Sequence, residues 1–126
     1  MVIIDEVGML QPLRPLEDSA RERGEVARSL KLLARELTVP VVALSRLPEP
    51  RRPDRRPMLA DLPEGERQAA GLVMLLHRPE LDDPWTPRRD EADLILAKHQ
   101  GGPTDVVTAM FQGQYCRFAP IATRSL

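Results

Sequence analysis

The sequence is poor in cysteine and in aromatic residues, and each scarcity narrows the class of protein. Among its 126 residues there is one cysteine, Cys116, so no internal disulfide can form and nothing argues for secretion. Aromatic residues make up only 3% of the chain, so the core must be aliphatic. There is no run of about 18 apolar residues and no signal peptide, so we expect no membrane association and a cytoplasmic location.

The charge balance is close to neutral and does not by itself indicate a nucleic-acid partner. Lysine and arginine number 18 against 19 aspartates and glutamates, which gives a net charge of −1. The length is one domain's worth, which is small for a complete nucleotide-binding α/β domain. We expect that domain over residues 1–120, followed by a frayed tail over residues 121–126.

The chain opens on an apolar run that ends abruptly at two carboxylates, Asp5 and Glu6. A short, continuous run of this kind is typical of a strand buried on both faces of a parallel α/β sheet. Ligands of such sheets bind beyond the carboxyl ends of the strands. In P-loop ATPases a strand like this carries the Walker B aspartate, which helps to hold Mg²⁺. Taken alone, the segment favours a plainer interpretation, a buried strand followed by solvated acids.

The next segments predict a strand–helix–strand unit. Asp18 or Ser19 can cap a helix that runs to about Leu37, with Gly24 as a weak point that costs ~1 kcal/mol relative to alanine. Its apolar residues recur at the spacing of one buried stripe, namely Val26, Leu30, Leu33 and Leu37. Residues 41–44 form a second apolar strand, and the order strand, helix, strand favours a right-handed parallel crossover.

The second half of the chain predicts further strands. Residues 72–76 form a third buried strand and residues 92–97 a fourth. A hairpin joins residues 106–111 to residues 115–118, and we expect Cys116 to be a buried thiol there. The fold class is therefore α/β, with a mostly parallel sheet, flanking helices and a C-terminal β-hairpin.

Several collinear segments resemble the C-terminal ATPase domain of DnaB-like replicative DNA helicases, a RecA-like hexameric motor. They follow the family's order at nearly its spacing and cover almost the whole chain: residues 3–5, 28–37, 39–45, 56–62, 97–98, 102–104 and 111–118. The resemblance implies a partial RecA-like P-loop NTPase fold. It also places the Walker B interpretation of Asp5 ahead of the plainer one.

The resemblance covers only the back half of that motor domain. The family's P-loop should precede Asp5, yet nothing precedes Met1 and no G-x-x-x-x-G-K-[ST] pattern occurs in the sequence. That loop cradles the phosphates of ATP and supplies a lysine that pairs with them. The family's catalytic glutamate also lies upstream, and Glu6 is not its match. We therefore expect no autonomous ATPase activity, and whether the chain is an enzyme stays open.

By resemblance, four residues belong to a site for ATP and Mg²⁺. Asp5 is the Mg²⁺ ligand. Ser45 ends the second strand, and Arg46 stands where the family has a glutamine that senses the γ-phosphate. Lys98 reaches the nucleotide of a neighbouring subunit, although an ordinary strand-end lysine is an equal alternative. Gln100 stands where the family has its arginine finger, a residue typically worth ~10³–10⁵ in rate. Both ATP and Mg²⁺ are implied by the resemblance, and the chain alone could bind neither.

The family's DNA-binding loop is altered in this sequence. Glu64 and Gly65 are what remains of it, and Pro63 has neither a guanidinium nor an N–H to contact a phosphate. An arginine cluster could follow a single-stranded DNA backbone, and its members are Arg51, Arg52, Arg55 and Arg56. Interleaved prolines and the absence of nearby aromatic residues favour a solvated loop instead.

Two hypotheses about function follow from the resemblance. In the first, the chain is a fragment of a DnaB-like helicase, whose complete relatives couple ATP hydrolysis to DNA unwinding during replication. In the second, it is a non-enzymatic degenerate or regulatory module that packs on an intact helicase subunit. The implied partners are single-stranded DNA and either further copies of the chain or a partner helicase subunit.

The absence of a P-loop half also has a consequence for the sheet. In RecA-like domains the P-loop strand lies between the strands that match residues 41–44 and 72–76. Without it, these two strands either pair directly or leave open apolar edges, which are an aggregation hazard. We therefore expect an isolated chain that is marginally stable, oligomeric or dependent on a separate segment.

Overall fold

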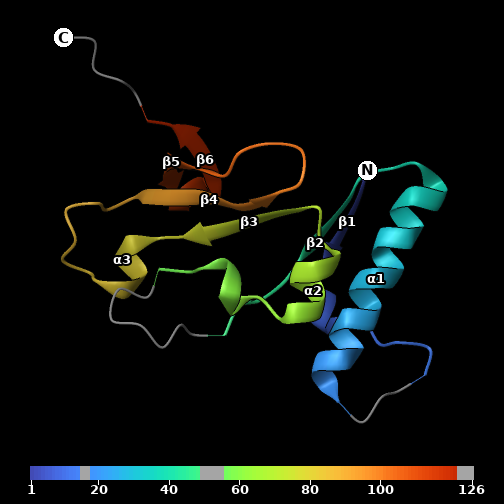
Figure 1. Cartoon of the computed structure of the whole chain (residues 1–126). Helices are drawn as coiled ribbons and strands as arrows, with labels where there is room; N and C mark the ends of the chain where they lie inside the picture. The colour runs from blue at the N-terminus through green and yellow to red at the C-terminus, as the bar shows by residue number, and fades with distance from the viewer. Residues whose placement is uncertain (15–17, 49–55, 122–126) are drawn as a thin grey trace. The chain divides into compact units, whose positions relative to one another are not determined.

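The computed structural model describes residues 1–14, 18–48 and 56–121 of the chain (Figure 1). These residues form two compact units. The first unit consists of Met1–Pro48 and Ala60–Gly71, and the second of Glu49–Leu59 and Leu72–Leu126. The first unit holds a two-stranded sheet and the second a four-stranded one.

The first unit is built on a parallel strand pair joined by a long helix. Strand β1 (Val2–Asp5) pairs in parallel with β2 (Val41–Leu44). A short 3₁₀ turn, η1 (Val7–Met9), follows β1. Helix α1 (Ser19–Leu37) begins where Asp18 accepts a 2.9 Å hydrogen bond from a backbone N–H of the first turn. The strands, the helix, its capping residue and the parallel pairing confirm the prediction from sequence.

The apolar stripe of α1 is buried only near the start of the helix. Val26 is buried and Leu30 is half-buried, whereas Leu33 and Leu37 are 38% and 54% exposed. The prediction of one buried stripe is therefore confirmed for the first half of the helix and wrong for the second half. The buried half is the part of α1 that a second helix covers.

That second helix packs on α1 where the sequence has a glycine. Helix α2 (Glu64–Ala69), which follows the 3₁₀ turn η2 (Leu59–Asp61), approaches so closely that a Cβ on Gly65 would lie 2.3 Å from the Cα of Gly24. Only glycine allows this approach at Gly65, because a Cβ there would overlap the facing backbone. Gly24, a weak point of the helix by propensity alone, is thus the residue that admits α2.

The second unit is an antiparallel sheet in the order β3-β4-β5-β6. Its strands are β3 (Leu72–His77), β4 (Glu91–His99), β5 (Asp105–Gln112) and β6 (Arg117–Pro120). A short helix, α3 (Pro79–Asp82), follows β3, and a 3₁₀ turn, η3 (Gly113–Tyr115), joins β5 to β6. In Figure 1 the four strands follow one another from yellow to red.

The α/β class and the C-terminal hairpin are confirmed, but the prediction of a mostly parallel sheet is wrong. Among the strands of the described residues, only β1 and β2 are parallel, and a long helix joins them. The connections from β4 to β5 and from β5 to β6 span residues 100–104 and 113–116. A parallel crossover needs about a dozen residues or more, so connections this short can join only antiparallel neighbours.

The strands are also less buried than the sequence predicts. In β3, Val73 and Leu75 are buried, whereas Leu72, Met74 and Leu76 are more than half exposed. This alternation is typical of an antiparallel sheet with one covered face. Strand β1 likewise carries exposed apolar side chains. The prediction of strands buried on both faces is therefore wrong in both units.

Strands β2 and β3 do not pair with each other in the part of the chain that the structure describes. Strand β2 pairs with β1 alone, and β3 pairs with β4 alone. The sequence left two arrangements open, direct pairing of these strands or open edges, and direct pairing is not found among the described residues. The expectation of a marginally stable, oligomeric or segment-dependent chain stays a prediction.

The expectations about the single cysteine and about membrane-spanning segments can be compared with the structure. Cys116 is exposed and has a left-handed backbone φ of 47° directly after η3, so the prediction of a buried thiol is wrong. Within the described ranges, no helix has the length and apolar character needed to cross a membrane.

Candidate functional site

The carboxyl ends of β1 and β2 meet at one edge of the first unit. Asp5, the last residue of β1, lies opposite Leu44, the last residue of β2, and Ser45 and Arg46 follow directly. Because the strands are parallel, the residues that end or follow them share this edge, the usual ligand-binding edge of α/β sheets. We call Asp5, Ser45 and Arg46 the carboxyl edge. It unites three of the four residues that the sequence assigns to a nucleotide site.

Arg46 is held at the carboxyl edge by Glu6. Its Nη2 lies 3.2 Å from Oε2 of Glu6, and its side chain is 83% exposed. An ion pair this exposed contributes at most about 1 kcal/mol to stability, so its main effect is to orient the guanidinium. An oriented and accessible guanidinium is well suited to bind a phosphate group.

Asp5 fits one ligand position of Mg²⁺, but the carboxyl edge does not fit a complete protein site for the ion. In residues 1–14, 18–48 and 56–121, no group of three or more histidine, cysteine, aspartate or glutamate side chains could hold a metal. Mg²⁺ usually keeps several waters and binds one or two carboxylates together with the phosphates of a nucleotide. The exposed carboxylate of Asp5 therefore suits Mg²⁺ that arrives with a nucleotide.

Lys98, the fourth residue assigned to the nucleotide, belongs to the second unit. It lies in β4 opposite Val73 and is half-buried. It is therefore not among the residues that the first unit brings together at the carboxyl edge. Its contact with the nucleotide of a neighbouring subunit stays a prediction.

Two of the residues predicted to contact DNA lie on α2. Glu64 is exposed, and its Oε1 accepts a 2.8 Å hydrogen bond from Nε2 of Gln68 one turn later. Gly65 packs against Gly24 of α1, so its observed contact is helix packing. A role of α2 in DNA binding stays a prediction that would rest on Glu64 and the exposed face of the helix.

One member of the predicted arginine cluster has a partner inside the protein. The side chain of Arg56 is 46% exposed, and its Nη2 lies 4.0 Å from Oδ2 of Asp93 in β4. Arg51, Arg52 and Arg55 lie outside the described residues. The contact gives Arg56 a structural partner, and DNA binding by the cluster stays a prediction.

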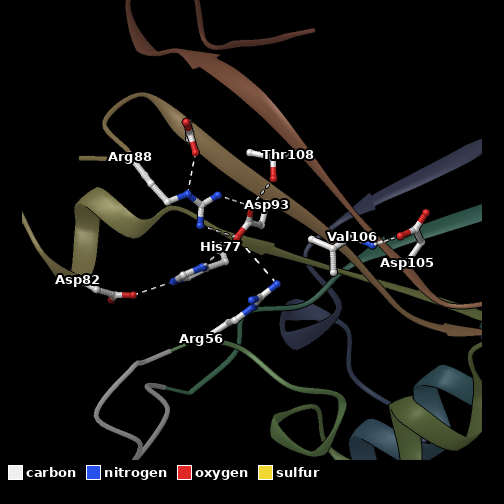
Figure 2. Close-up of polar contacts among 9 residues, drawn as sticks. Arg56, His77, Asp82, Arg88, Asp93, Asp105, Val106 and Thr108 are labelled. Atoms are coloured by element: carbon white, nitrogen blue, oxygen red, sulfur yellow. Dashed lines mark hydrogen bonds and ion pairs between the residues drawn. The ribbon is translucent and has the colours of Figure 1, made fainter. Parts of the chain in front are cut away.

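A buried aspartate, which the sequence analysis does not single out, is the centre of a polar cluster in the second unit (Figure 2). Asp93 is 2% exposed and accepts two hydrogen bonds from Arg88, of 2.6 Å and 3.2 Å. The hydroxyl of Thr108 on β5 donates a third, of 2.8 Å. Arg88 also donates a 2.7 Å hydrogen bond to Glu91. The buried carboxylate is therefore fully compensated by donors, as a buried charge must be.

His77 connects α3 to the same cluster. Its Nε2 lies 2.9 Å from Oδ2 of Asp82 at the end of α3, and its Nδ1 lies 3.7 Å from Oδ2 of Asp93 (Figure 2). The imidazole is only 12% exposed. These contacts connect α3 to the sheet through His77.

The cluster changes the titration of both of its principal members. The hydrogen bonds from Arg88, and after them that from Thr108, favour the ionised carboxylate and hold the pKa of Asp93 at about 2, although burial opposes them. The hydrogen bonds of Arg88 to Asp93, and after them the one to Glu91, raise the pKa of Arg88. Both members of the pair are therefore charged at neutral pH.

The signal for this cluster in the sequence is a charge inside an apolar strand. Asp93 interrupts the run that predicts a strand over residues 92–97. Aspartate is almost never buried unless it is paired. An aspartate in a strand with apolar residues on both sides therefore indicates a buried polar partner, although the sequence does not say which residue that partner is.

Acid should weaken the second unit through Asp93. Because the pKa of Asp93 is lower in the folded protein than in the unfolded chain, the unfolded chain takes up the proton first as the pH falls. The contribution, about 2 kcal/mol, is complete above about pH 5 and is lost between about pH 4 and pH 2. We expect the difference in unfolding free energy between the wild type and Asp93→Asn, measured in urea, to shrink over this range. A difference that does not change with pH would show that the pair does not form.

The fold and the carboxyl edge define a class, an α/β domain with polar side chains at the carboxyl ends of a parallel strand pair. The family model of the DnaB-like helicase C-terminal domain matches residues 1–120. The chain therefore belongs to this family, and the resemblance read from the sequence is confirmed.

Individual relatives agree with this assignment. The chain is 48% identical to the replicative DNA helicase DnaB of Leifsonia xyli subsp. xyli over 127 residues, which are 97% of this chain and 28% of that protein. It is 35% identical to the replicative DNA helicase DnaC of Bacillus subtilis, covering 98% of this chain and 28% of that one. Among solved structures, the ATPase domain of G40P matches 95% of this chain and 44% of its own, at 34% identity and a TM-score of 0.90. The chain thus spans about a quarter of the length of these curated relatives.

Proposed function

We propose that this chain forms the carboxyl-terminal part of the ATP-driven motor of a DnaB-like DNA helicase, acting in the cytoplasm during replication. The observation that carries the proposal is the carboxyl edge, where the exposed carboxylate of Asp5 and the guanidinium of Arg46 share one end of a parallel strand pair. A carboxylate suits the metal and a guanidinium suits the phosphates of Mg·ATP. Membership of the DnaB-like helicase family supports the assignment of this edge to a helicase motor.

Each residue at the carboxyl edge has a distinct part in nucleotide binding. Asp5 is a ligand of Mg²⁺, and Glu6 orients Arg46 towards the phosphates through their 3.2 Å ion pair. Ser45 directly follows β2 beside them. Mg²⁺ bound with the nucleotide neutralises charge on the phosphates. Lys98 contacts the nucleotide of an adjacent subunit in an oligomer, and single-stranded DNA is the polymer on which the motor acts.

Phosphate binding must be completed by residues outside this sequence. The sequence has no G-x-x-x-x-G-K-[ST] pattern, whose backbone amides and lysine hold the phosphates in P-loop ATPases. The match to less than half of a solved ATPase domain leaves room for that part of the motor. ATP hydrolysis is therefore a property of the assembled motor, and this chain supplies one edge of its site.

A second function, a regulatory module without enzymatic activity, is favoured by particular residues. Gln100 stands where the resemblance predicts an arginine finger, and Pro63 precedes α2 without an N–H that could contact a phosphate. A module of this kind would pack on an intact helicase subunit. It would bind that subunit tightly without contributing to nucleotide binding.

A chimaera tests the first proposal against the second. In it, this chain replaces the matching part of the solved G40P ATPase domain. We expect the chimaera to bind Mg·ATP in calorimetry and Asp5→Ala to weaken binding by at least about tenfold, because loss of a residue that only orients a metal ligand already costs about 10–100-fold. Asp105→Ala, an exposed aspartate of the second unit, is the matched control and should leave affinity unchanged.

Three outcomes separate the possibilities. A folded chimaera that binds Mg·ATP equally well with Asp5→Ala contradicts the role of Asp5. A folded chimaera that binds no Mg·ATP, together with an isolated chain that binds an intact helicase subunit, supports the regulatory function. Micromolar binding to the isolated chain, lost in Asp5→Ala, would show that the chain holds a complete site by itself.

A further inference from the structure

Arg23 of α1 lies between two carboxylates that come from different parts of the first unit. Its Nε is 3.8 Å from Oε1 of Glu66 on α2. Glu6, which follows β1, is a second carboxylate nearby. The position that a Cβ on Gly8 would take is 3.3 Å from Nη2 of Arg23 and 3.2 Å from Oε1 of Glu6. The guanidinium therefore pairs with Glu66 on α2 and has Glu6 as a charged neighbour across the space beside Gly8.

Glu66 depends on Arg23 more than an ordinary surface carboxylate would. Its side chain is only 7% exposed, and its Oε1 accepts no hydrogen bond within the described residues. At 3.8 Å, Arg23 compensates the buried charge without donating a hydrogen bond to it. A buried carboxylate with an unfilled acceptor position favours any movement that brings the guanidinium closer.

Glu6 differs from Glu66, because it already pairs with another cation, Arg46. Oε2 of Glu6 pairs with Arg46 at 3.2 Å, while Oε1 faces the Arg23 side of the unit. Arg46 thus pairs with one oxygen of Glu6, and Arg23 lies near the other across the position of a Gly8 Cβ. A phosphate that drew Arg46 away from Glu6 would leave Glu6 with Arg23 as its remaining cationic neighbour, in competition with Glu66.

We infer that Arg23 is a positioning residue that Glu6 and Glu66 share, and that it ties the carboxyl edge to α2. The inference rests on the proposed function, since the carboxyl edge is the proposed phosphate edge and α2 carries Glu64, a residue predicted to lie near DNA. The glycine contact between Gly24 and Gly65 lies next to Arg23 and Glu66 in the two helices, so the helix crossing fixes their separation. An ion bound at the edge would thereby alter the ion pair that holds α2, which is a physical route for coupling two sites.

The test is an NMR measurement on the full chain that follows the side-chain Nε–H signal of Arg23. We expect this signal to shift in both Glu6→Gln and Glu66→Gln, because both substitutions remove a charge that the guanidinium faces. Glu25→Gln is the matched control, since Glu25 is an exposed residue of the same helix that pairs with Arg28. A signal that responds to Glu66→Gln but not to Glu6→Gln would overturn the inference.

A second variant changes the contact without removing a charge. A methyl group at Gly8 would press between Glu6 and Arg23, at 3.2 and 3.3 Å, so Gly8→Ala should also shift the Arg23 signal. Gly113→Ala should not, because the new Cβ would lie 3.8 Å from its nearest neighbour, Cε1 of Phe111, which is an ordinary contact distance. If Glu6→Gln unfolds the chain, an unmoved signal in folded Gly8→Ala overturns the inference. Failure of the chimaera to bind Mg·ATP, with the Arg23 shifts intact, would refute the proposed function and leave the shared ion pair in place.

Discussion

Replacing Asp93 by asparagine is expected to destabilise the second unit by about 2–4 kcal/mol. Two arguments give this range. A pKa held at about 2 corresponds to about 2 kcal/mol of preferential interaction with the charged carboxylate. Removing one partner of a buried ion pair costs about 3–5 kcal/mol, and the partial exposure of Arg88, at 38%, places this case towards the lower end.

The effect should be confined to one of the two units. Hydrogen exchange measured residue by residue can show this, because it reports the opening of each strand separately. We expect exchange in β3, β4 and β5 to accelerate by about 30-fold or more, which corresponds to about 2 kcal/mol. Exchange in α1, which belongs to the first unit, should change little.

Asp105→Asn provides the matched control for this variant. Asp105 is an exposed residue at the start of β5, and its Oδ1 accepts a 2.7 Å hydrogen bond from the backbone N–H of Val106 (Figure 2). The same chemical change there should stay within about 0.5 kcal/mol, as is usual for surface substitutions. Equal effects of Asp93→Asn and Asp105→Asn would mean that the buried cluster contributes nothing to stability.

The first unit was predictable because its signals are local in the sequence. Asp18 stands where a helix must begin, and an apolar run marks each strand on either side of the helix. A long helix between two such strands allows a parallel pair. The carboxyl edge then follows, because Asp5 and Ser45 come at the ends of the two strands.

In the second unit the prediction of parallel strands is wrong. The expectation of a mostly parallel sheet came from fold class, although residues 100–104 between β4 and β5 are few and include two glycines. Connections of 3–5 residues that contain glycine are typical of hairpins. Loop length alone would have predicted the antiparallel pairing that the structure shows.

The cluster around Asp93 could not be predicted because its members meet only through the strand register. Asp93 lies opposite Thr108 in the β4–β5 pairing, and Arg88 reaches back from the preceding loop. The sequence places an aspartate in an apolar strand but does not state which donors face it. The contact between Gly24 and Gly65 is hidden for the same reason, since helix packing brings together positions far apart in the chain.

Replacing Gly65 by alanine is the second change with a large expected effect, and its sign is informative. In a helix that nothing approaches, glycine to alanine stabilises by up to about 1 kcal/mol. In α2, the new Cβ would lie 2.3 Å from the Cα and 3.0 Å from the backbone N of Gly24, and backbone atoms cannot rotate away. We therefore expect a loss of about 1–3 kcal/mol, as α2 is pushed off α1.

The reciprocal change gives a graded comparison. A Cβ on Gly24 would meet the Cα of Gly65 at 3.2 Å, which a small shift of α2 can relieve, so Gly24→Ala should cost less than Gly65→Ala. Gly113→Ala, with its nearest neighbour at 3.8 Å, serves as the control in the other unit. Urea unfolding of the three variants, followed by hydrogen exchange in α1, would rank them. A Gly65→Ala protein more stable than the wild type would mean that α2 does not pack on α1, and the tie between α2 and the carboxyl edge through Arg23 would fall with it.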